Sequence, residues 1–184
     1  MKRFVFFFLF LFCLFSVSVG FASETVLDYF FPEGKSQFDV YDQSGNTVIG
    51  YSIAEFKRDL SGGELSLYQD KYHGRLAAAN HYRVLIDNDK ILLKDLGNRY
   101  SSPVVVFVLP VEGVPCRWSA SPFLSSDVQE RWDFLAILDG GILKITCYVY
   151  DKLGRYLPQK SFVSYWEKGK GVTRFLQGYE LANP

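Results

Sequence analysis

The chain has 184 residues, of which 48% are hydrophobic, and its 20 Lys and Arg are matched by 20 Asp and Glu. This length suits one domain with its own core, and the balanced charge creates no strong field for nucleic acid or an anionic membrane surface. The unusual feature of the composition is its aromatic fraction, which is 17%.

The N-terminal segment has the three parts of an export signal. Lys2 and Arg3 precede an unbroken apolar run over residues 4–15, and small residues follow that run. The run is shorter than the ~20 residues that span a bilayer, so we predict that residues 1–22 are a cleaved signal peptide. The alternative is a leader retained as an anchor. Cleavage leaves residues 23–184 as a single β-rich domain in the periplasm or outside the cell, with no stable membrane span.

Turn signals recur at short intervals along the rest of the chain, and β-branched and aromatic runs lie between them. The turns are expected at 44–46, 61–63, 87–89, 139–141, 151–154 and 168–171. In the run 142–150, apolar residues at the odd positions alternate with Lys144, Thr146, Tyr148 and Tyr150. Period two predicts strands, and short glycine-containing loops join antiparallel neighbours. The fold class is therefore all-β, or mainly β with one short helix, as a curved antiparallel sheet, half-barrel or barrel-like meander.

Two short segments have helical features. Residues 126–131 have the spacing of a capping box between Ser126 and Gln129, although a polar loop explains them equally well. A second short helix is expected around residues 54–60, because the pair Gly62 and Gly63 that follows would end it.

The segment 164–180 reads SYWEKGKGVTRFLQGYE and predicts a β-hairpin that turns at residues 168–171. Glycine provides the positive φ that a tight turn requires, and the two lysines keep an exposed tip soluble. The aromatic residues on both sides are expected to serve mainly in packing.

Three short motifs carry a family resemblance: Tyr29–Pro32 followed by Gly34, the segment from Leu109 to Trp118, and the closing segment Tyr165–Val172. With these motifs the chain resembles secreted bacterial β-rich proteins of uncharacterised function, whose half-barrel is similar to that of the lipoprotein-localisation carriers. The resemblance implies export and a curved sheet that holds an apolar ligand in its concave face. It implies no catalytic residues.

Two cysteines follow the leader, Cys116 and Cys147. An exported protein lies in a compartment that permits oxidation, so a disulfide between them is one alternative. A pair of buried free thiols is the other, because the sequence does not fix the distance between the two Cα atoms.

His73 and His81 are the two histidines of the chain, and neither belongs to a nucleophile or metal motif. The chain has no Gly-x-Ser-x-Gly segment, and only scattered aspartates accompany the histidines. We therefore predict no catalytic residues, no metal and no cofactor. A small secreted hydrolase that uses His73 or His81 is kept as an alternative.

The aromatic residues give the most specific functional hypothesis. Packing in a sheet core is their ordinary role. The alternative is that Tyr148, Tyr150, Tyr165 and Tyr179 line a concave cavity or an exposed patch that binds a lipid-like, sugar or protein partner. The sequence thus favours a non-enzymatic protein of the bacterial envelope that binds a lipid-like or other apolar ligand, or a protein partner. A purely structural envelope component is a further alternative, and the oligomeric state stays open.

Overall fold

The computed structural model describes residues 25–72, 75–76, 80–99, 101–121 and 130–178. The predicted leader, His73, Tyr179 and most of the predicted helix at 126–131 lie outside these residues. The described elements are α2 (Val26–Tyr29), β1 (Gly34–Tyr41), β2 (Val48–Asp59), β3 (Gly62–Tyr72), β4 (Arg75–Leu76), β5 (Asn80–Asp87), β6 (Lys90–Asp95), β7 (Val104–Val108), β8 (Cys116–Ala120), β9 (Arg131–Asp139), β10 (Ile142–Tyr150), η1 (Pro158–Lys160), β11 (Phe162–Glu167) and β12 (Gly171–Gln177).

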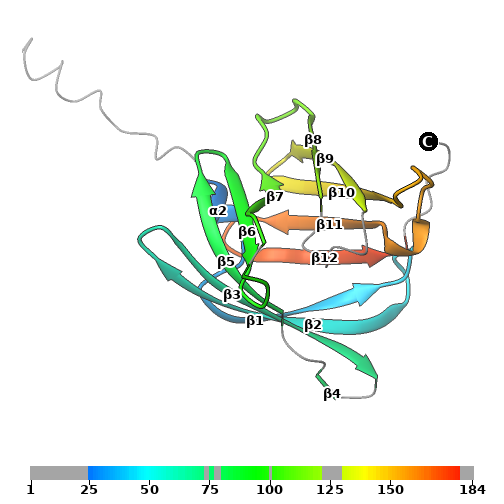
Figure 1. Cartoon of the computed structure of the whole chain (residues 1–184), viewed down its shortest axis with the longest axis horizontal. Coiled ribbons are helices and arrows are strands. Elements are labelled where there is room, and N and C mark those ends of the chain that lie inside the picture. Colours follow the sequence, from blue (N-terminus) through cyan, green and yellow to red (C-terminus); the bar gives the residue numbers. More distant parts are fainter. Residues whose placement is uncertain (1–24, 73–74, 77–79, 100, 122–129, 179–184) are drawn as a thin grey trace, which may run out of the picture.

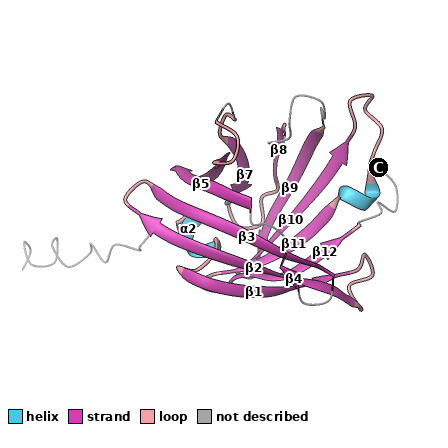
Figure 2. Ribbon diagram, turned by 60° about the horizontal axis from the view of Figure 1, so that its bottom comes forward, coloured by secondary structure: helices cyan, strands magenta, loops and turns pink. Residues whose placement is uncertain are grey.

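The strands form one continuous sheet in the order β7-β6-β5-β3-β2-β1-β12-β11-β10-β9-β8, and β4 pairs with β3. The pairs along this order are antiparallel except for β1 and β12, the first and last of the described strands, which run parallel. The sheet curves almost into a closed barrel around α2, with one seam between β7 and β8 (Figures 1 and 2). The predicted β-rich, barrel-like fold is therefore confirmed, and the parallel pair is an addition to it.

Among the described residues, a single side-chain hydrogen bond crosses the seam between β7 and β8. The Nε1–H of Trp118 on β8 donates to the carbonyl oxygen of Val105 on β7 at 3.1 Å. The Trp118 ring also stacks on Phe134 of β9, with the ring centroids 4.8 Å apart. This side chain thus fixes one edge of the sheet to the other.

The hairpins follow the turn chemistry that the sequence indicates. Asp139 pairs with Ile142, which leaves Gly140 and Gly141 as a two-residue loop with φ of +57° and +76°. Positive φ at both loop residues is the requirement of the turn type whose twist matches a β-hairpin. In the same way, Asn88 with φ of +54° turns the chain between β5 and β6.

The helix expected around residues 54–60 is wrong, because this segment belongs to β2. Ala54 and Phe56 are buried while Lys57 is exposed, and Ala54 and Phe56 pair with Leu67 and Leu65 of β3. Burial with a period of two, reinforced by strands on both sides, decides the structure here against a local helical tendency.

The α-helix found among the described residues, α2, is only four residues long and lies inside the barrel. The backbone N–H of Thr25 donates to the Asp28 carboxylate at 3.0 Å, which satisfies one donor at the helix start. Val26 and Tyr29 are each 1% exposed, and the helix packs against β6 and β12. We call the end of the barrel that α2 enters the closed end; it also contains the β2–β3, β5–β6, β9–β10 and β11–β12 turns.

The β11–β12 turn holds α2 in place. The backbone N–H of Gly169 donates to the carbonyl oxygen of Asp28 at 2.6 Å. A Cβ atom on Gly171 would lie 2.9 Å from Pro32 Cδ and 3.2 Å from the Phe30 carbonyl oxygen. The glycines of the predicted hairpin therefore serve a second purpose, since they allow the segment after α2 to cross the turn at close range.

Candidate ligand cavity

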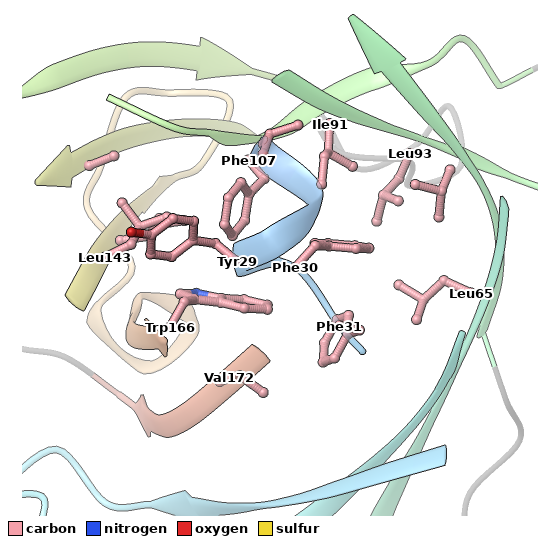
Figure 3. Packing of buried hydrophobic residues seen from close by; sticks show 14 of the residues in the cluster. Tyr29, Phe30, Phe31, Leu65, Ile91, Leu93, Phe107, Leu143, Trp166 and Val172 are labelled. Atoms are coloured by element: carbon pink, nitrogen blue, oxygen red, sulfur yellow. The ribbon is translucent and has the colours of Figure 1, made fainter. Parts of the chain in front are cut away.

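An aromatic cluster forms the floor of the barrel interior, just above α2 (Figure 3). Phe30 lies at its centre, with ring-centroid distances of 5.0 Å to Phe31, 5.7 Å to Phe56, 5.8 Å to Phe107 and 6.0 Å to Trp166. The first three contacts are edge-to-face, which is a favoured arrangement of aromatic rings. The floor therefore joins the segment after α2 to β2, β7 and β11.

Above this floor lies a cavity of about 490 Å³. Its walls come from strands around most of the barrel, because each strand turns alternate side chains inward. Most of the lining side chains are aliphatic or aromatic: Phe30, Phe31, Phe38, Val40, Ile49, Leu65, Leu67, Leu93, Val106, Phe107, Trp132, Ile145, Phe162, Trp166, Val172 and Phe175. This volume falls within the usual range for small-molecule sites, roughly 300–1,000 Å³.

The cavity opens at the end of the barrel opposite α2. Ile49, at the start of β2, is 56% exposed and still lines the cavity, and so does the exposed Gln177 at the end of β12. We call this the open end. A ligand would enter here and meet the aromatic floor at the bottom.

A few neutral polar groups lie among the apolar walls. They include the hydroxyls of Ser52, Ser164 and Tyr82, and the carboxamide of Gln177. The Ser164 hydroxyl accepts the indole N–H of Trp166 at 2.8 Å, so part of its hydrogen-bonding capacity is used. Such sparse polar groups in an apolar cavity are the groups that orient a ligand.

Two carboxylates lie close to the open end, one on each side of the seam between β7 and β8. Asp95 pairs across β5 and β6 with Tyr82, so both side chains point to the same face of the sheet. Burial, and secondarily the charge of Asp95, raise the pKa of Tyr82. On the β9 side of the seam, Glu130 accepts the indole N–H of Trp132 at 3.3 Å and forms an ion pair with Lys160.

The tyrosines that the sequence nominated lie elsewhere. Tyr148 and Tyr150 alternate with Cys147 and Val149, which belong to the interior cluster, and Tyr165 alternates with the cavity residues Ser164 and Trp166. They therefore point to the outer face, where the Arg131 guanidinium lies 4.7 Å from the Tyr150 ring centroid. The three described tyrosines do not line the cavity. That these tyrosines bind a partner at the outer face stays a prediction. Tyr179 lies outside the described residues.

His81 lies on β5 next to the inward-pointing Tyr82, so its ring is on the outer face. The Nδ1 atom of His81 is 2.9 Å from the hydroxyl oxygen of Ser66, its cross-strand partner on β3. The pair is away from the cavity. Cross-strand pairs of this kind commonly stabilise sheets. His73 lies outside the described residues, and within the described part of the chain no group of three His, Cys, Asp or Glu side chains has the arrangement to hold a metal ion.

The two cysteines are free thiols, so the disulfide alternative is not the one that the structure adopts. Cys116 lies on β8 and Cys147 on β10, with β9 between them. Neighbouring strands are about 4.8 Å apart, so positions across an intervening strand exceed the roughly 7 Å limit of Cα separation in a disulfide. Burial raises the pKa of the Cys147 thiol, which keeps it protonated and unreactive.

The comparisons with known proteins give no relative from which a function could be inferred. No protein-family model, curated protein or solved structure matches the chain. Among the described residues, no helix has the length and apolar character to cross a membrane. The functional argument therefore depends on the cavity itself.

Proposed function

We propose that this protein is an exported, non-enzymatic binding protein of the bacterial envelope that holds an apolar molecule inside its barrel. The observation that supports the proposal is the apolar cavity of about 490 Å³, open at one end and floored by Phe30, Phe31, Phe107 and Trp166. Filling such a cavity would contribute about 25 cal/mol for each Å² of apolar surface removed from water. The apolar N-terminal run supports the proposed export.

Native mass spectrometry of the protein, expressed with its own leader and purified from the exporting cells, tests this proposal. We expect a co-purifying apolar molecule at near-stoichiometric amount, identified after extraction with organic solvent. An empty protein that also fails to bind the neutral fluorophore N-phenylnaphthylamine would contradict ligand binding. It would favour a structural or protein-binding role instead.

A pair of variants on β3 connects binding to the cavity. Leu67 lines the cavity, whereas its neighbour Tyr68 does not. We expect Leu67→Trp to fill part of the space and weaken fluorophore binding roughly tenfold or more, because a ligand must then overpack the core. Tyr68→Trp introduces the same side chain on the other face and should leave binding unchanged. Equal effects of the two variants would place the binding site outside the barrel.

The hydrolase alternative now has one supporting observation, the close contact between the Ser66 hydroxyl and His81 Nδ1. A serine hydroxyl next to an imidazole is the first element of a nucleophile and general-base pair. Turnover of an activated ester that disappears in both Ser66→Ala and His81→Ala, with folding intact, would favour this alternative. Turnover unchanged in both variants would exclude Ser66 and His81 as the nucleophile and general base.

A further inference from the structure

The charges around the cavity point to a ligand class, and this inference rests on the proposed binding function. We propose that the cavity selects apolar molecules with an uncharged polar group, such as an alcohol, ester or amide, over those that carry a carboxylate or another anion.

The first observation is the chemistry of the lining. Among the described residues that line the cavity, none is Lys, Arg or His; the polar side chains are those of Ser52, Tyr51, Tyr82, Ser164 and Gln177. Hydroxyl and carboxamide groups can donate to and accept from an uncharged polar group. They provide no full positive charge to compensate an anion that leaves water, and an uncompensated buried charge is far more costly than a hydrogen-bonded neutral group.

The second observation is the negative charge near Tyr82. This tyrosine lines the cavity, and its cross-strand partner Asp95 points to the same face. The Asp95 carboxylate accepts the backbone N–H of Gly97 at 2.8 Å, which holds it at the end of β6. An anionic head group beside Tyr82 would meet both an apolar wall and this carboxylate.

The third observation concerns Lys160, the cation that pairs with Glu130 on the other side of the seam. Lys160 forms an ion pair with Glu130, whose side chain is only 4% exposed. The other oxygen of the same carboxylate accepts the indole N–H of the cavity residue Trp132. Lys160 therefore compensates a buried carboxylate, and releasing it to a ligand would leave Glu130 buried and unpaired.

Matched ligands with the same chain and different head groups test the inference. Decanol and decanoate would compete against N-phenylnaphthylamine for the exported protein at about pH 8, where the free acid is ionised. We expect decanol to bind roughly tenfold or more tightly than decanoate, because an ionised carboxylate loses its hydration without a counter-ion. The difference should shrink as the pH falls toward the pKa of the acid, since the protonated acid is neutral.

A variant that introduces the missing cation should largely offset the preference for decanol. Gln177→Arg places a guanidinium on a lining position at the open end, whereas Gln37→Arg makes the same exchange on β1, at an exposed position that does not line the cavity. We expect Gln177→Arg to raise decanoate affinity roughly tenfold and to change decanol affinity little, because a carboxylate then gains a bidentate partner. Gln37→Arg should change neither affinity.

The outcomes separate this inference from the proposed function. If decanoate binds as tightly as decanol at about pH 8, the selection against anions is refuted and the cavity remains a binding site. If the fluorophore, decanol and decanoate all fail to bind, the proposed function fails. A gain of decanoate affinity in Gln37→Arg as large as in Gln177→Arg would also refute the inference, because long-range charge alone would then explain it.

Discussion

Replacing Phe30 with alanine tests the arrangement on which both the fold and the cavity depend. Phe30 is 3% exposed, and its ring contacts four others, from the segment after α2, β2, β7 and β11. Truncating a buried Phe to Ala typically costs about 3–5 kcal/mol. One side of the ring already borders the cavity, so fewer contacts are lost there, and we expect a cost near the lower limit, about 3 kcal/mol.

For a domain of this size, about 3 kcal/mol corresponds to a decrease in Tm of roughly 6–12 °C. Urea unfolding followed by far-ultraviolet circular dichroism measures the free-energy change directly, and an unchanged m-value would show that the same surface is exposed on unfolding. Leu60→Ala is the control. Leu60 is fully exposed in the β2–β3 turn, and its loss should change stability by less than about 0.5 kcal/mol.

A loss below about 1 kcal/mol in Phe30→Ala, with an unchanged m-value, would refute the reasoning. It would mean that the segment after α2 does not form the floor of the barrel. The aromatic cluster would then not close the cavity at that end.

Three further predictions concern the glycines of two hairpin turns, the seam between β7 and β8, and the surface turn that contains Asp151. Gly63→Ala should destabilise the fold by more than about 1 kcal/mol, because the φ of Gly63 is +147° and a Cβ would lie 2.3 Å from the Lys57 carbonyl oxygen. Gly140→Ala is the control, since no atom lies within 4 Å of the added Cβ. Its loss of unfolding free energy, measured in urea, should be smaller. Trp118→Phe keeps an aromatic ring but removes the donor that crosses the seam, and we expect a loss of about 0.5–1.5 kcal/mol together with faster amide exchange in β7; unchanged exchange would contradict the role of this bond. The pKa of Asp151 is lowered, first by the backbone N–H of Arg155 and further by the side chain of that residue, so its stabilisation is complete above the unfolded pKa of about 4 and is lost as pH falls through the folded value. Asp151→Asn should therefore show a weaker loss of urea stability on acidification below about pH 5 than the parent protein, and an equal loss would count against this carboxylate.

The strand pattern was predictable from the sequence because alternation is a local property. The apolar residues at 143, 145, 147 and 149 were expected on one face, and all four are buried. The hairpin at 164–180 was also predicted, and β11 and β12 confirm it up to residue 178. These features depend on the pleat of a strand and on the turn residues beside it, both of which are visible in a short segment.

Which face of each strand points into the barrel was harder to predict. Tyrosines of β10 and β11 were nominated because they are aromatic, for either a cavity or an exposed patch. In a nearly closed barrel the fully apolar face turns inward, so Leu143 and Ile145 take the interior and Tyr148 takes the outside. The amphipathic character of tyrosine, with an apolar ring and a polar tip, suits the solvent side of the sheet.

The helix α2 and the cavity floor were missed for a different reason. Four helical residues are too few to show a period of 3.6, and the segment Tyr29–Pro32 was used only as a motif of the family resemblance. Its burial depends on contacts with β7, β11 and the β11–β12 turn, which lie far away in the sequence. The adjacent bulky residues Phe30 and Phe31 before Pro32 were the available signal.

The parallel pairing of β1 with β12 affects how the chain reaches its fold. Strands β1–β7 form one meander and β8–β12 another, and each can assemble from neighbouring segments along the chain. Joining them requires Val40 to pair with Phe175. The step that completes the barrel therefore carries the entropic cost of closing a loop of nearly the whole domain. The loop between β7 and β8 is the position at which the chain divides into these two units. Fragments cut there would each retain their own hairpins and would re-form the cavity only by associating.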